Sequence, residues 1–426
     1  LLHRSRETTM KQRLLALLTV VLLCSVPGWL SAENWPAWRG PAGVGTSSET
    51  GFPVKWSTAS NIAWKVPLPG PGNSTPIIWG KQVFISQASD EGRTRSLLCF
   101  SLADGKKLWE QSVRHEKEEL THKTNPQCAS SPVTDGSTVV VWHGSAGLHA
   151  YDMDGNKRWS KDLGQFQHVW GTAASPVIFE NQVILNCGPG LRTFWIGLDL
   201  SNGEEAWRSE VPDASSEKVE EFRGSWSTPV IHGSGKKAVM FLSMPSRLYA
   251  ASPRSGVISW TCEGPSKLVY TSPLVTDKTV VTMSGYGGPS LAIRRGGSGD
   301  VTGSHRLWHK PDKPDNPQRV GSGVIVGDHL YILNEPGIAW CLEVATGTRL
   351  WQKRLGSGGS WSSMCHVDGR LYVVNMEGTT FVLKPDPGEC QVLAENKLEE
   401  LTRGSLAFSQ GKIVVRTYKH LFCIGE

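Results

Sequence analysis

Tryptophan recurs along this chain at a nearly constant spacing, and this spacing constrains the fold more than any other feature. Seven copies, separated by 45, 50, 48, 53, 48 and 43 residues, are Trp64, Trp109, Trp159, Trp207, Trp260, Trp308 and Trp351. In five of the seven units a glycine stands four residues before the tryptophan, as Gly155 does before Trp159. Glycine supplies the positive φ of a hairpin turn, so the tryptophan begins the next strand. A period of this length fits four short antiparallel strands.

A second repeated position carries a serine or threonine at the start of a short apolar strand. Its eight members are Thr75, Ser131, Ser175, Thr228, Ser272, Ser322, Ser363 and Ser405. We expect each hydroxyl to satisfy a turn amide or to bridge to the neighbouring unit. A role as nucleophile is not supported, because eight equivalent residues cannot each have a dedicated base and acid.

The two ends of the repeat region fit each other. The last unit, residues 405–424, has three strands, whereas residues 61–66 form an isolated strand with the periodic Trp64. Pairing the two closes a ring without an open edge, and a linear solenoid would need caps instead. The sequence therefore predicts an all-β fold: an eight-bladed β-propeller of four-stranded antiparallel blades, closed by pairing the N-terminal strand with the C-terminal blade.

We divide the chain into a signal peptide at residues 1–32, an N-terminal arm at 33–60 and the propeller at 61–426. Residues 10–13 are basic and residues 14–26 are apolar, as in a secretory leader, and the residues before Met10 fit an over-extended gene start. We expect no lipid anchor at Cys24, because Leu23 stands where a small residue is required. These features predict a periplasmic or secreted protein with no transmembrane segment in the mature chain.

The net charge and the cysteines limit the kinds of partner and metal site that we expect. The net charge of +5 falls to about +2 without residues 1–32 (5 − 4 + 1), and no basic stripe occurs. We therefore expect no nucleic-acid partner. We also expect the protein to be a monomer. Eight cysteines remain after Cys24, none adjacent and none in a Cys-x-x-Cys motif. We interpret them as small core residues and predict no metal site.

The hydroxyl positions also predict a binding site. Residues two positions earlier share the same face of an extended strand; they are Asn73, Ala129, Ala173, Trp226, Tyr270, Val320, Trp361 and Arg403. Preceding loops add Trp170, Arg223 and Arg319, together with His122, Asn125, Gln127 and His168. The predicted ligand-binding funnel consists of Trp226, Tyr270, Trp361, Arg403, Asn73, Trp170, Arg223 and Arg319, which could stack on and clamp a planar or sugar-like ligand with negative charge. The alternative is that these side chains plug the funnel or pack between blades.

Residues 197–207, 341–351 and 99–109 resemble the tryptophan-docking motif of the PQQ-like (quinoprotein alcohol dehydrogenase-like) propellers. The arm Trp35-Pro36-Ala37-Trp38-Arg39-Gly40-Pro41 is similar to the N-terminal signature of exported planctomycete-type members. The resemblance implies that each tryptophan wedges between neighbouring blades. It also implies two kinds of function, because the superfamily holds PQQ- and calcium-dependent dehydrogenases as well as the propeller lipoprotein of the outer-membrane assembly machinery.

The sequence departs from the dehydrogenases, since no vicinal cysteines and no matching Glu, Asn or Asp occur. We therefore assign no catalytic residues and expect no bound PQQ or calcium. The resulting hypothesis is an exported non-catalytic propeller that serves as a binding or scaffolding module in the cell envelope, with an envelope protein or a saccharide-type ligand as partner. The alternatives are a PQQ-dependent alcohol or sugar dehydrogenase with a degenerate site, and a small-ligand sensor that uses the central funnel.

Overall fold

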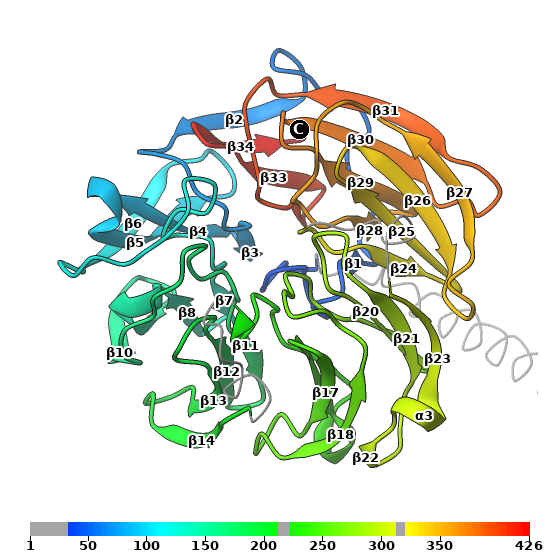
Figure 1. Ribbon diagram of the computed structural model, residues 1–426. Helices are drawn as coiled ribbons and strands as arrows, with labels where there is room; N and C mark the ends of the chain where they lie inside the picture. Colours follow the sequence, from blue (N-terminus) through cyan, green and yellow to red (C-terminus); the bar gives the residue numbers. More distant parts are fainter. Residues whose placement is uncertain (1–32, 212–221, 312–319) are drawn as a thin grey trace, which may run out of the picture. The chain divides into compact units, whose positions relative to one another are not determined.

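The computed structural model describes residues 33–211, 222–311 and 320–426, which form eight antiparallel sheets arranged as blades in a ring (Figure 1). Blades one to four comprise β3 Ile77–Trp79, β4 Gln82–Ser89, β5 Thr94–Ser101 and β6 Lys107–Arg114; β7 Val133–Thr134, β8 Thr138–Trp142, β9 Leu148–Asp152 and β10 Lys157–Lys161; β11 Val177–Phe179, β12 Gln182–Cys187, β13 Phe194–Asp199 and β14 Glu205–Ser209; and β15 Val230–His232, β16 Val239–Met244, β17 Arg247–Ala251 and β18 Ile258–Glu263.

Blades five to eight comprise β19 Leu274–Val275, β20 Thr279–Met283, β21 Ser290–Arg294 and β23 Arg306–Lys310; β24 Val324–Val326, β25 His329–Asn334, β26 Ile338–Glu343 and β27 Arg349–Arg354; β28 Cys365–Val367, β29 Arg370–Val374, β30 Thr379–Lys384 and β31 Gln391–Lys397; and β32 Ala407–Ser409, β33 Lys412–Arg416, β34 His420–Ile424 and β2 Ile62–Pro67. Two short strands pair in parallel with the edges of two blades: β1 Thr46–Ser47 with β28, and β22 Gly299–Asp300 with β18. The helical turns are η1 Asp90–Gly92, η2 Gly144–Ala146, η4 Gly235–Lys237 and α3 Thr302–His305.

Position within the blade determines which side chains are buried. The second strand of blade two, Thr138–Trp142, is buried at every residue because neighbouring blades cover both of its faces. The outermost strand of blade one, Lys107–Arg114, alternates between exposed and half-buried residues. The sheets therefore pack face to face around the ring, and the cores lie between adjacent blades.

Strand β2 closes the ring. It pairs antiparallel with β34, from Ile62 opposite Ile424 to Pro67 opposite His420. Arg416 of β33 reinforces this junction from within blade eight, since its guanidinium donates to Ser74 Oγ at 2.9 Å and is fully buried. The predicted fold class, including the closure by the N-terminal strand, is confirmed.

The periodic tryptophans lie on the outermost strands of seven blades and pack against the next blade. The Trp64 indole N–H donates to the Leu102 carbonyl at 2.9 Å, and Trp159 donates likewise to Leu200 at 2.8 Å. A Cβ at Gly105 would lie 2.7 Å from the Trp64 ring. The turn glycine is therefore required twice, for its positive φ of +71° and because the indole of the preceding blade lies against it.

The N-terminal arm enters the ring instead of lying outside it (Figure 1, dark blue). Trp35 bridges to Ile78 of blade one, with N···O distances of 2.9 and 2.8 Å, and the Pro36 carbonyl accepts from Thr134 N–H of blade two. Arg39 then donates to the Gly323 carbonyl of blade six, and Thr46–Ser47 pairs with blade seven. The arm thus crosses the channel and contacts the inner strands on both sides of it.

Residues 1–32 lie outside the described residues, so the signal peptide and the absence of a lipid anchor at Cys24 stay predictions. In the part of the chain that the structure describes, no helix is long and apolar enough to cross a membrane. The eight cysteines of this part are all buried and carry free thiols.

Candidate ligand-binding site

The eight repeated hydroxyls form a closed circle of hydrogen bonds at the centre of the propeller, which we call the hydroxyl ring. Each hydroxyl oxygen accepts the backbone N–H of the equivalent residue in the preceding blade, at N···O distances between 2.8 and 3.3 Å. The circle ends where it began, because Ser405 N–H donates to Thr75 Oγ1 at 3.1 Å. All eight residues are at least 95% buried. The hydroxyls therefore bridge adjacent blades, and none of them hydrogen-bonds to a histidine or carboxylate of the described residues.

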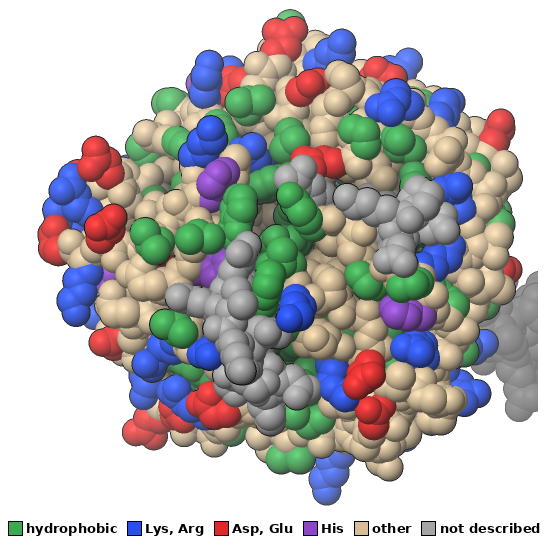
Figure 2. Space-filling model, viewed as in Figure 1, with side chains coloured by type: hydrophobic (Ala, Val, Ile, Leu, Met, Phe, Trp, Pro, Cys, Tyr) green, Lys and Arg blue, Asp and Glu red, His purple; other side chains and the backbone are tan. Residues whose placement is uncertain are grey.

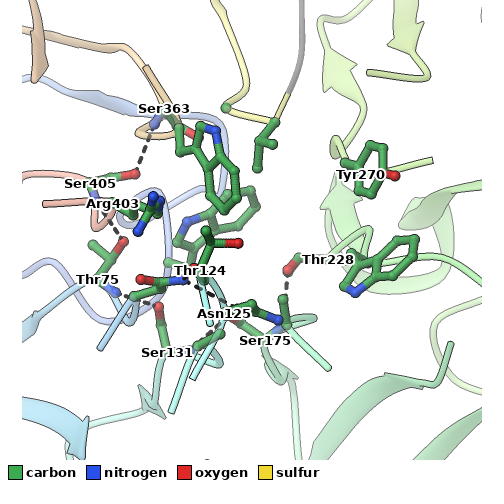
Figure 3. A pocket seen from close by; sticks show the side chains of 18 of the residues that line it. Thr75, Thr124, Asn125, Ser131, Ser175, Thr228, Tyr270, Ser363, Arg403 and Ser405 are labelled. Atoms are coloured by element: carbon green, nitrogen blue, oxygen red, sulfur yellow. Dashed lines mark hydrogen bonds between the residues drawn. The ribbon is translucent and has the colours of Figure 1, made fainter. Parts of the chain in front are cut away.

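A pocket of about 140 Å³ opens over this ring, and residues from every blade line it. Hydrophobic side chains gather around the hollow at the centre of this face (Figure 2). Six ring hydroxyls contribute, namely Thr75, Ser131, Ser175, Thr228, Ser363 and Ser405 (Figure 3). All eight residues that stand two positions before a ring hydroxyl line the same pocket: Asn73, Ala129, Ala173, Trp226, Tyr270, Val320, Trp361 and Arg403. Strand alternation thus brings these side chains to one place, and their binding role is taken up below.

Trp226 and Tyr270 form one aromatic wall. Their rings are stacked, with centroids 4.8 Å apart and an interplanar angle of 28°. The Trp226 indole N–H donates to the Gly171 carbonyl at 2.8 Å, and the edge of His168 packs against its ring at 4.9 Å. Because these contacts fix the indole from behind, its orientation is set before any ligand arrives.

Trp361 and Arg403 form the opposite wall. The Arg403 guanidinium carbon lies 4.6 Å from the centre of the Trp361 ring, a cation–π distance, and the Trp361 indole N–H donates to Glu335 Oε1 at 3.1 Å. Arg403 also donates to the Tyr418 hydroxyl. Burial lowers the pKa of Arg403, although the nearby Glu335 carboxylate opposes the effect, and an arginine remains a cation at neutral pH.

Asn73 connects the rim of three blades. Its amide N–H groups donate to the Thr124 carbonyl at 2.9 Å and to Asn125 Oδ1 at 3.3 Å. Asn125 in turn donates to the Trp170 carbonyl at 2.7 Å. Asn73 and Trp170 line the pocket as predicted from the sequence, and the Trp170 ring packs on His122 with centroids 4.5 Å apart.

Two predicted funnel residues are not placed in the pocket. Arg223 does not line it: the loop before Trp226 turns so that the Arg223 carbonyl accepts the Gly190 N–H at 3.0 Å. Arg319 lies outside the described residues.

The sequence analysis missed Trp38 and Thr124, which also line the pocket. Trp38 comes from the arm inside the channel, outside the repeat. The tryptophans at positions 35 and 38 indicated that the arm packs against the propeller, because two large apolar side chains on a short arm are expected to be buried.

The side chains of the pocket do not suit a calcium ion such as the one the resemblance to the PQQ enzymes implies. Calcium takes several oxygen ligands, commonly including carboxylates, whereas none of the described lining residues is an Asp or Glu. No group of three or more His, Cys, Asp or Glu with metal-binding geometry occurs in the described part of the chain. We therefore derive no chemical step through these cofactors.

These features define the class: a closed eight-bladed propeller whose blades are joined by indole contacts, with a pocket at its centre. A family profile described as outer membrane protein assembly factor BamB matches residues 46–168 and 117–301, together more than half of the chain. The chain therefore belongs to this family of PQQ-like propellers. A comparison with curated proteins finds no match.

Solved structures with the same fold include BamB and dehydrogenases. BamB from Moraxella catarrhalis superimposes with a TM-score of 0.60 at 14% identity, covering 86% of this chain and 97% of that one. A europium-containing methanol dehydrogenase gives 0.67 at 10% identity, covering 91% and 90%. A quinohemoprotein alcohol dehydrogenase from Comamonas testosteroni gives 0.67 at 11%, covering 92% and 81%. At these identities the similarity shows the fold alone.

Proposed function

We propose that this chain is a non-catalytic binding propeller of the cell envelope, which holds a saccharide-type ligand in the central pocket. The observation that carries the proposal is the pair of facing walls, Trp226 with Tyr270 and Trp361 with Arg403, above a polar floor. Aromatic faces pack on the apolar C–H face of a sugar ring, and polar groups beneath bind its oxygens.

A non-catalytic role follows from the use of the lining groups. Every ring hydroxyl accepts a backbone N–H, and none of them hydrogen-bonds to a histidine or a carboxylate among the described residues. Nucleophilic catalysis by a hydroxyl needs such a base within reach. The description of the matching family as an assembly factor also supports a binding role, and the predicted leader supports an envelope location.

A saccharide-binding screen on the purified chain tests the proposal, followed by titration calorimetry with any sugar that binds. We expect Trp226→Ala to weaken binding by at least tenfold, because burying a large apolar side chain contributes roughly 1.5–3 kcal/mol. Leu108→Ala is the matched control, since Leu108 is exposed on an outer strand far from the lining residues. Absence of saccharide binding, or a Trp226→Ala variant that is folded and binds as well as the wild type, would overturn the proposal.

A further inference from the structure

We infer that the ligand of the central pocket is an acidic sugar, such as a uronic acid residue, whose carboxylate is received by the hydroxyl ring and Arg403. This inference rests on the proposed function and adds to it the chemical class of the ligand. It depends on three observations: the unused donors of the ring, the positive charge of Arg403 in the lining, and the small number of side-chain acceptors other than the ring hydroxyls.

The hydroxyl ring is a circle of hydrogen-bond donors. A serine or threonine hydroxyl has one proton and two lone pairs. In the ring, a lone pair of each oxygen accepts a backbone N–H, as Ser131 Oγ does from Thr75 and Ser405 Oγ from Ser363. Among the described residues, none of the eight O–H groups has an acceptor. Six of these hydroxyls line the pocket, so their protons are available to a ligand.

The charge on the described lining of the pocket is positive, although the Glu335 carboxylate, which does not line the pocket, accepts from Trp361 and acts on Arg403. Arg403 is the one charged side chain among the described lining residues, and its Nε is buried with no hydrogen-bond partner there. A second arginine, Arg39, follows the lining residue Trp38 in the sequence; it does not line the pocket and is 1% exposed. Its Nε and Nη1 also have no partner, and no described carboxylate forms an ion pair with Arg39. Burial lowers the pKa of Arg39 to about 10, which leaves it a cation at neutral pH.

Apart from the ring hydroxyls, side-chain acceptors are few among the described lining residues. The side-chain oxygens of the two asparagines already accept: Asn73 Oδ1 from Tyr418, and Asn125 Oδ1 from Asn73. Each ring oxygen keeps its second lone pair, so the ring can also bind a neutral hydroxyl. The free O–H donors together with one cationic side chain favour a ligand end that brings its own negative charge.

The ligand would place one sugar ring between the two walls of the pocket. The stacked Trp226 and Tyr270 would cover one face of such a ring, and its carboxylate would point towards the ring hydroxyls and Arg403. We therefore expect recognition of a terminal acidic residue of a saccharide, or of the free acid.

The test compares acids with their neutral counterparts on the whole purified chain. Glucuronate and galacturonate are titrated against glucose and galactose by calorimetry, with acetate as the anion control. We expect the acids to bind at least about tenfold more tightly than the neutral sugars, because hydrogen bonds to charged groups are the stronger ones. Equal affinity for acid and neutral sugars would overturn this inference and leave the proposed function standing. Binding of none of the four sugars would overturn both.

Variants assign the charge to its residue. We expect Arg403→Gln to reduce the preference for acid over neutral sugar to threefold or less, while Arg403→Lys retains most of it. Arg223→Gln removes the same charge from a residue that does not line the pocket, and the preference should be unchanged. An Arg403→Gln variant that keeps the full preference, or acetate that competes as well as glucuronate, would contradict the inference.

Discussion

Substitution of Thr228 by valine tests the hydroxyl ring directly. Valine has the shape of threonine without the hydroxyl, so the change removes one acceptor from the ring and leaves the packing nearly unchanged. The group that loses its partner is the backbone N–H of Ser175, which donates to Thr228 Oγ1 at 3.0 Å. Thr228 itself still donates its backbone N–H to Ser272 Oγ at 2.9 Å.

The expected cost follows from burial. Ser175 is 2% exposed and Thr228 is 5% exposed, so water cannot easily replace the lost acceptor. An unsatisfied buried donor costs about 1–3 kcal/mol, and we expect Thr228→Val to lower the free energy of unfolding by that amount. Thr228→Ser retains the hydroxyl and matches the serines at six of the eight ring positions, so its loss should be well below 1 kcal/mol.

Urea unfolding gives the global effect, and amide hydrogen exchange gives the local one. The Ser175 amide should exchange faster in Thr228→Val than in the wild type, whereas amides of the opposite blades should keep their protection. If Thr228→Val were as stable as Thr228→Ser and the Ser175 amide were equally protected, the ring would not stabilise the blade junctions, and our reasoning would be wrong.

Three further predictions use other parts of the molecule. Gly105→Ala should lower the free energy of unfolding by more than about 1 kcal/mol in urea unfolding, because the residue has φ +71° and its Cβ would lie 2.7 Å from Trp64. Gly80→Ala is the control for the cost of the positive φ alone, because Gly80 has φ +55° and no atom lies within 4 Å of its Cβ position. Burial of Glu400 tends to raise its pKa, but hydrogen bonds from Thr417, His420 and Lys65 prevail and hold it below the ordinary value of 4.5. The Glu400 carboxylate therefore stabilises the folded state above the unfolded pKa, and this stabilisation is lost as the pH falls through the folded pKa. In unfolding curves measured at several pH values, the stability difference between the wild type and Glu400→Gln should narrow below about pH 4.5. Addition of PQQ and Ca²⁺ should produce no dye-linked alcohol oxidation, because the described lining residues supply no carboxylate for the metal; sustained turnover would refute this.

The sequence predicted the architecture well because a repeat reports the same information many times. The spacing of the tryptophans, the turn glycines and the hydroxyls each mark the same blades, so an irregular copy does not obscure the pattern. Blade seven, for example, has Val392 in the stretch where a tryptophan is expected, yet its four strands form as in the other blades. The alternation of a strand then placed the eight residues of the pocket lining from one register.

Segments without a repeated counterpart could not be placed in this way. Trp38 reaches the pocket through an arm that crosses the channel, and only the three-dimensional contacts of Trp35 and Arg39 show its course. Arg223 was predicted to line the pocket and does not. Its loop precedes the segment that carries Trp226, but counting residues along a loop does not tell in which direction each side chain points. Strand periodicity is a physical constraint on side-chain direction, and loops have no equivalent constraint.

The contrast between the two sets of lining residues supports the proposed binding role of the pocket. The hydroxyl ring is nearly uniform because each member performs the same task, which is to join one blade to the next. Two residues earlier on the same strands the side chains differ in every property, from Ala173 to Trp226 and Arg403. Closing the ring imposes no such variety, and two alanines at these positions are compatible with the fold. The large aromatic rings and the guanidinium are therefore consistent with the binding role that we propose. At the half-buried Trp361 and Arg403, we expect substitutions to change ligand binding more than they change stability.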